Sequence, residues 1–134
     1  MHYLDTNILV YSVINQDPFK MEQSQAIIHD LFAKQSLLLS PLSLQELIFT
    51  LSKLKISKAD IEKAYLLFRE FCEYEIDRDI IDDAFKISAE LSFGRNINDI
   101  IHLKFAERYA VDLSTYDKDF NALKSHSTVN IILL

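Results

Sequence analysis

Glycine and proline are scarce in this chain, and their scarcity limits the folds that it can adopt. The 134 residues include one glycine and two prolines. All-β folds need glycine in many tight turns, so this composition disfavours them and favours helices joined by short polar links. It also excludes two kinds of nucleotide site, because neither a G-x-G-x-x-G fingerprint nor a Walker A phosphate loop can be built with Gly94 alone.

A chain of this length is expected to form one domain, residues 1–134, with a sizeable buried core. The lone Cys72 rules out an intrachain disulfide and a cysteine-rich zinc site. No apolar stretch approaches the length of a membrane span and no signal peptide is evident, which predicts a cytoplasmic protein without a membrane partner. The net charge of −6 argues against a nucleic-acid partner. That argument weakens if acidic side chains converge on divalent cations, which would cancel the charge locally.

Short apolar runs alternate with amphipathic helical patterns along the chain. Strands are expected near residues 2–5, 36–40, 74–76, 110–114 and 129–132, and helices near residues 8–14, 19–34, 42–54, 57–71, 79–93, 100–109 and 117–123. This alternation predicts an α/β fold with three layers, in which helices cover both faces of a central, mainly parallel sheet of four to five strands.

Four acidic residues occupy positions that amphipathicity explains poorly. Asp5 ends the first strand, and Glu46 lies within an apolar helix after the second strand. Asp99 begins the helix expected at 100–109, and Asp117 follows the strand that ends near Thr115. Right-handed crossovers place the carboxyl ends of parallel strands at one edge of the sheet, where ligands bind in such folds. These acids are therefore candidates to converge in space.

Each acid also has an ordinary structural interpretation. Asp5 and Asp99 could cap helices, and Asp117 could stabilise a turn. Glu46 could close a capping box with Ser43, although that role disappears if the helix begins at Ser40 and Pro41 instead. The residue at which this helix begins therefore decides whether Glu46 can act in a capping box.

Taken together, the four acids favour a metal site. Clustered carboxylates repel one another, and a cation is the usual compensation. All-oxygen ligands favour hard ions such as Mg²⁺, which keeps several waters and binds substrate phosphate oxygens. Such a site can orient a phosphodiester and activate water for attack.

Four segments of the chain, in order, resemble the signature segments of the PIN-domain nucleases, with VapC-type toxins as the nearest likeness. They are Leu4-Asp5-Thr6-Asn7-Ile8-Leu9, the helical Glu46, Asn98-Asp99-Ile100-Ile101-His102, and Ser114-Thr115-Tyr116-Asp117-Lys118-Asp119-Phe120. The resemblance implies a PIN-like fold and an endoribonuclease that depends on Mg²⁺ or Mn²⁺ and hydrolyses RNA phosphodiester bonds through a metal-activated water. It also implies the toxin of a VapBC-type pair, a homodimer held inactive by a VapB-like antitoxin.

The resemblance assigns roles to particular residues. Asp5, Glu46, Asp99 and Asp117 would be catalytic, and the first, third and fourth of these would bind the metal. Thr115 and Asp119 would support them, with the family pattern favouring Asp117 over Asp119 as the acid that faces the metal. Arg95 is a candidate for binding substrate phosphate, because a guanidinium can donate two hydrogen bonds.

Two other interpretations remain at this point. A catalytically inactive PIN-like module could bind RNA or protein without cutting it. A dehalogenase-like phosphatase also begins with a strand and an aspartate, but its second aspartate would stand where Asn7 does. His102 shares a helix face with Asp99 and could support the site by hydrogen bonding, although a packed or surface histidine is the more ordinary interpretation.

Overall fold

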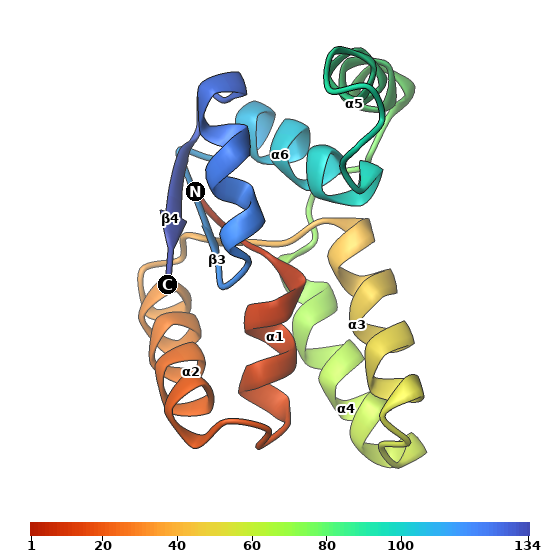
Figure 1. The fold of residues 1–134 in the computed structure, drawn as a ribbon. Helices are drawn as coiled ribbons and strands as arrows, with labels where there is room; N and C mark the ends of the chain where they lie inside the picture. The colour runs from red at the N-terminus through yellow and green to blue at the C-terminus, as the bar shows by residue number, and fades with distance from the viewer.

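Four parallel strands form the centre of the molecule in a computed structural model that describes residues 1–134 (Figure 1). They are β1 (His2–Leu4), β2 (Leu37–Leu38), β3 (Asp112–Thr115) and β4 (Asn130–Leu133). Their spatial order is β2-β1-β3-β4, and every neighbouring pair is parallel. Strand order therefore reverses between β1 and β3, which is where ligands bind in open parallel sheets. The predicted parallel sheet is confirmed, with four strands.

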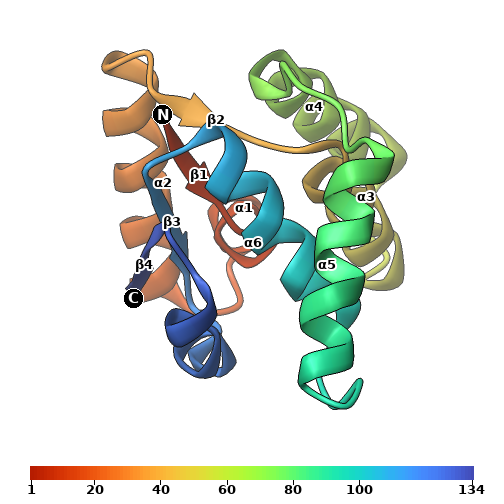
Figure 2. The same ribbon diagram turned by 90° about the horizontal axis from the view of Figure 1, so that it is seen from above.

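Helices connect the strands and cover both faces of the sheet. Their bounds are α1 (Thr6–Val13), α2 (Pro18–Ala33), α3 (Pro41–Lys53), α4 (Lys58–Phe68), α5 (Arg78–Glu90) and α6 (Ile97–Tyr109), with 3-10 helices η1 (Arg69–Phe71) and η2 (Lys118–His126). Figure 2 shows α2 on one side of the strands and α6 on the other. The three-layer α/β/α arrangement predicted from the sequence is thus the observed one. None of these helices combines the length and the apolar character that crossing a bilayer requires.

Two hydrophobic cores lie on opposite faces of the sheet, because successive strand residues point to opposite sides. Tyr3 belongs to the core beneath α5, α6 and η2. Its neighbour Leu4 belongs to the core beneath α1, α2, α3 and α4. In the same way, Leu38 belongs to the first of these cores and Leu39 to the second. This explains why the strands read as uniformly apolar rather than alternating.

The beginning of α3 decides the role of Glu46. Ser40 caps the helix, its hydroxyl accepting from the backbone N–H of Ser43 at 3.1 Å, and Pro41 occupies the first helical position. Ser43 therefore completes the capping box with Ser40, and Glu46 falls in the second turn. Its carboxylate is free for another purpose.

Two expectations about element bounds were wrong. Residues 74–76 form no strand; the ring of Tyr74 stacks on that of Tyr109, with centroids 4.1 Å apart, and Asp77 then caps α5. Helix α6 starts three residues earlier than the pattern suggested, because Asn96 caps it and Ile97 opens it. Asp99 consequently lies inside the first turn of α6, where the positive end of the helix dipole favours an acid.

Candidate active site

The four predicted acids line one cleft at the carboxyl ends of β1 and β3. The cleft has a volume of about 320 Å³. Asp5 reaches it from the end of β1, Glu46 from α3, Asp99 from α6 and Asp117 from the segment after β3. The other lining residues are Thr6, Asn7, Val10, Tyr11, Gln16 and Thr50. The fold therefore brings together side chains from four segments that are far apart in the sequence.

Asp5 is the best-anchored of the four acids. It is 6% exposed, and its carboxylate accepts from the backbone N–H of Thr6 at 2.7 Å and from the hydroxyl of Thr115 at 2.6 Å. Burial raises the pKa of Asp5, while the charge of His102 and these hydrogen bonds act in the opposite direction. The capping role considered from sequence is real, since the same carboxylate caps α1. Asp5 therefore caps α1 and lines the cleft at the same time.

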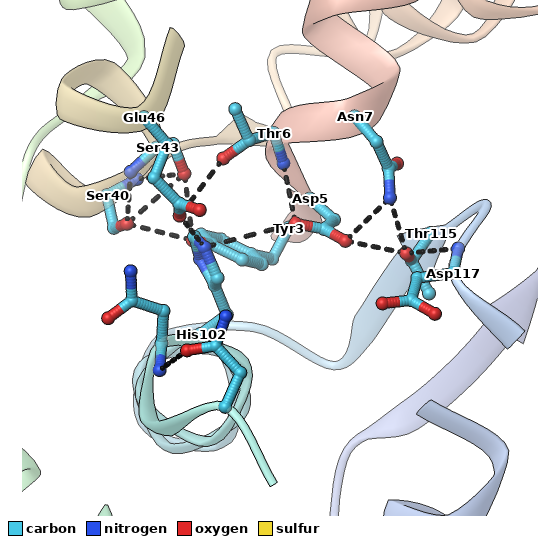
Figure 3. Close-up of polar contacts among 12 residues, drawn as sticks. Tyr3, Asp5, Thr6, Asn7, Ser40, Ser43, Glu46, His102, Thr115 and Asp117 are labelled. Carbon is cyan, nitrogen blue, oxygen red and sulfur yellow. Dashed lines mark hydrogen bonds and ion pairs between the residues drawn. The ribbon is translucent and has the colours of Figure 1, made fainter. Parts of the chain in front are cut away.

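Asn7 holds the ends of β1 and β3 together. Its amide nitrogen donates to Asp5 Oδ2 at 2.9 Å and to Thr115 Oγ1 at 3.0 Å (Figure 3). Its amide oxygen accepts from the backbone N–H of Tyr116 at 3.2 Å. Sequence reasoning had singled out Thr115 as a supporting residue and had assigned Asn7 no such part. The three-residue run Asp-Thr-Asn at a strand end was the available signal.

Asp99 lies among other acids of the cleft, and its pKa is raised. Burial raises its pKa to about 6, and the nearby charges of Asp5 and Asp117 add to the effect. A bound cation would offset this effect, because an opposite charge close to a carboxyl group favours its ionised form. The carboxylates are thus close enough to repel one another, as the hypothesis of an acidic cluster requires.

The choice between Asp117 and Asp119 is clear in the geometry. Asp117 lines the cleft, whereas Asp119 is exposed and is absent from the lining. The two are linked, because the backbone N–H of Asp119 donates to Asp117 Oδ1 at 2.9 Å. Arg95 is also absent from the lining; it lies between α5 and α6, just before Asn96 caps the latter. Its role in binding substrate stays a prediction.

A buried polar chain lies behind the cleft and includes His102, for which the sequence left open both a supporting hydrogen-bond role and a packed or surface position; its partners Tyr3, Ser40 and Ser43 were not predicted. His102 is 1% exposed, and its Nε2 contacts Glu46 Oε1 while its Nδ1 contacts the hydroxyl of Tyr3. Burial alone would lower the pKa of His102, but the hydrogen bond to Glu46 and the charge of Asp5 outweigh it, and the pKa is raised. The Tyr3 hydroxyl in turn lies 2.8 Å from those of both Ser40 and Ser43.

The oxygen ligands of the cleft suit a hard cation that keeps part of its water shell. They suit less well an ion that is enclosed entirely by protein side chains. The side chains provide carboxylate oxygens, which suit Mg²⁺ and Mn²⁺, and no cysteine lines the cleft to favour a softer metal. No three histidine, cysteine, aspartate or glutamate side chains stand close enough together to enclose an ion by themselves. Mg²⁺ commonly binds through one or two carboxylates and retains water in its other positions, so the four acids suit an ion held partly through water.

The fold and the cleft together define an α/β protein with a parallel sheet. Its candidate cation site lies where the strand order reverses, between β1 and β3. The PIN domain family model matches residues 2–125. The chain belongs to the PIN domain family, whose members are nucleases.

Solved structures with similar folds include toxin–antitoxin proteins from several bacteria. VapBC2 from Rickettsia felis, bound to a promoter DNA fragment, has 22% identity and a TM-score of 0.71, covering 100% of this chain and 99% of that one. VapC20 from Mycobacterium tuberculosis, a toxin that cleaves the sarcin-ricin loop, has 14% identity and a TM-score of 0.72, with 92% and 95% covered. A toxin–antitoxin complex from Klebsiella pneumoniae has 17% identity and a TM-score of 0.66, with 98% and 96% covered. No curated protein sequence gives a significant match.

Proposed function

We propose that this protein is a divalent-metal-dependent endoribonuclease and the toxin of a toxin–antitoxin pair. The observation that supports the activity best is the gathering of Asp5, Glu46, Asp99 and Asp117 around one cleft at the switch point of the sheet. Membership of the PIN domain family supports a nuclease, and the similar toxin folds support the biological role. The phosphatase alternative has no comparable support, because Asn7 is bonded to Asp5 and Thr115 as a structural clamp.

Asp5, Asp99 and Asp117 would hold Mg²⁺ or Mn²⁺, with Glu46 on the opposite wall of the cleft. A bound cation supplies charge stabilisation for the phosphodiester and activates water for attack. The chain contributes rigidity: Thr115 and Asn7 fix the carboxylate of Asp5, and the backbone N–H of Asp117 donates to Thr115 Oγ1 at 2.9 Å. Two of the three proposed ligands are therefore set by one hydrogen-bonded unit.

The test is cleavage of a structured RNA and of a DNA of matched sequence, with Mg²⁺, Mn²⁺ or EDTA. We expect internal cuts in RNA that need the metal and that the Asp117→Asn substitution reduces on the order of 10- to 100-fold, the usual effect of disturbing a metal site. Asp82→Asn is the matched control, because Asp82 is exposed on α5 and lies outside the cleft. Its activity should stay within about twofold of wild type. Metal binding without any cleavage would favour the inactive binding module instead.

The antitoxin is proposed to bind an apolar groove beside the end of α1, between α2 and α4. This groove has a volume of about 720 Å³, and its wall includes Phe32 and Leu67, which are 59% and 57% exposed. Large exposed apolar side chains around a groove are typical of protein interaction sites. An amphipathic helix of a partner would bury them. The resemblance to VapC-type toxins also supports a homodimer, which sizing of the purified protein would detect.

Leu67→Glu should abolish binding of the antitoxin. Placing a charge inside an apolar interface costs several kcal/mol, which lowers affinity on the order of 100-fold or more. The measurement is co-purification of the tagged chain with the product of a short reading frame directly upstream of its gene. Leu66→Glu is the control, because Leu66 is 50% exposed and lies outside the groove. Equal retention by both variants would place the antitoxin elsewhere.

A further inference from the structure

A histidine sits completely inside the protein, directly behind the acidic cleft, although the acids alone account for the proposed chemistry. His102 is 1% exposed and lies on α6, one turn after Asp99. A buried imidazole needs partners for both ring nitrogens, and here both have one. Its hydrogen-bond partners are Glu46 on α3 and Tyr3 on β1, and its Nε2 also lies 3.9 Å from Asp5 Oδ1. The ring thus bridges three elements (Figure 3).

The far end of this bridge is rigid. Tyr3 is fully buried, and its hydroxyl is held by Ser40 and Ser43, each at 2.8 Å. These two serines are themselves fixed, since they form the capping box that starts α3. The Tyr3 and His102 rings also pack together, with centroids 5.8 Å apart. Neither the position nor the orientation of the imidazole is free to vary.

The near end of the bridge is the acid that most needs support. Glu46 has a flexible side chain that is 30% exposed, in contrast to the buried Asp5. Its other polar contact is a long one, from the Thr6 hydroxyl at 3.4 Å. Both contacts use Oε1, which leaves Oε2 as the oxygen available to the cleft. Without His102, the carboxylate would exchange among solvent-exposed rotamers.

We propose that His102 is a positioning residue, which anchors Oε1 of Glu46 to the Tyr3–Ser40–Ser43 cluster so that Oε2 faces the cation site. The inference rests on the proposed metal-dependent function for its catalytic consequence. The bridge itself is a property of the metal-free protein. Glu46 is not one of the three proposed ligands, but it would face the ion and its bound water. Groups that orient the side chains around a metal site usually change metal affinity or activity 10- to 100-fold when they are removed.

The amide side chains provide a matched pair of variants. The amide nitrogen of glutamine can occupy the place of imidazole Nε2, whereas that of asparagine can reach only the place of Nδ1. His102→Gln therefore keeps the donor to Glu46, and His102→Asn keeps the contact with Tyr3 but releases Glu46. Both variants should fold, because Tyr3 retains its serine partners and Glu46 is exposed enough to be hydrated.

The experiment measures Mn²⁺ affinity by electron paramagnetic resonance, the Mg²⁺ dependence of RNA cleavage, and thermal melting of the metal-free variants. His102→Asn should weaken Mn²⁺ binding and raise the half-saturating Mg²⁺ concentration on the order of 10-fold. In His102→Gln, the Mn²⁺ affinity and the half-saturating Mg²⁺ concentration should stay within about threefold of wild type. The two variants should nevertheless melt at similar temperatures. Equal losses in both variants would overturn the proposal, and so would tighter metal binding in His102→Asn.

A second measurement separates this inference from the proposed function. Proton NMR of the metal-free protein should show a slowly exchanging imidazole N–H from His102, because its Nε2–H is buried and donates to a carboxylate. That resonance should be lost in Glu46→Ala. Its absence from the wild-type protein would refute the bridge whatever the enzyme does. If the wild type shows the resonance but neither binds metal nor cuts RNA, the proposed function fails while the bridge stands.

Discussion

Replacing Asp5 with asparagine is expected to lower metal-dependent RNA cleavage on the order of 100-fold or more, since several kcal/mol of transition-state stabilisation depend on the metal site. Asp5 is the acid at the centre of the arrangement. It is buried at the end of β1, and its carboxylate is held by Thr6, Asn7 and Thr115. Asparagine has nearly the same shape but lacks the negative charge, so the change would remove a proposed ligand of the cation with little change in volume.

Asp5→Asn should also destabilise the fold, but by less than it lowers activity, and the two effects can be measured separately. The new amide group would place a donor opposite the donating nitrogen of Asn7, which costs about 1–2 kcal/mol when a buried hydrogen bond is lost. Steady-state cleavage should therefore be measured at a temperature where circular dichroism shows that the variant is folded. Asp82→Asn again serves as the control. A folded Asp5→Asn protein with near wild-type cleavage would exclude the proposed site.

Without metal, the protein is expected to lose stability as the pH rises from about 4 to about 7. One cause is Asp99, whose pKa is raised from 3.8 to about 6 by burial and by the charges of Asp5 and Asp117. The pKa values of Asp5 and His102 are also raised, and these shifts act in the same direction. Between the two pKa values of Asp99 the folded state holds a proton that the unfolded state has released. Stability therefore falls as the pH rises through this window. A full shift of this size corresponds to about 3 kcal/mol, and solvent access to a half-buried group reduces the expected loss to roughly 1–2 kcal/mol.

Asp99→Asn should remove the part of that pH dependence that Asp99 contributes and raise the melting temperature of the metal-free protein near pH 7.5 by a few degrees. The measurement is a series of urea or thermal unfolding curves from pH 4 to pH 8 in EDTA. Asp82→Asn, an exposed change on α5, is the matched control. Adding Mg²⁺ should stabilise the wild type more than the Asp99 variant. A lower melting temperature for Asp99→Asn at pH 7.5 would contradict this account of the cleft.

Asp5 and Asp99 differ in ways that the sequence could not reveal. Clustered acids suggest that removing any one of them should relieve repulsion. In the structure, however, Asp5 is compensated by donors and caps α1, so neutralising it also removes useful contacts. Burial is the largest influence on the pKa of both carboxyl groups; at Asp99 the charges of Asp5 and Asp117 add to it, whereas at Asp5 hydrogen bonds from Thr115 and Thr6 oppose it. The environment of each carboxylate, rather than its charge alone, decides whether neutralising it stabilises the protein.

The sequence by itself determined the fold class, most elements and the four acids. The spacing of apolar residues and the capping residues are local signals. These signals were enough to predict the strands that lie between helices. They failed at residues 74–76, where the run is strand-like but has no neighbouring strand to pair with. They also located Asp99 near a helix start without placing the start itself, since a cap at Asn96 or Asn98 fits the pattern equally well.

Only the tertiary structure decided which side chains share an environment. It put Asp117 rather than Asp119 in the cleft, made Asn7 a clamp, and turned an ordinary-looking His102 into a bridge between α3 and β1. The physical reason is that local patterns report on neighbours along the chain, within a few residues. The contacts of His102 span 56 and 99 residues, and such partners are fixed only when the sheet order and helix packing are complete.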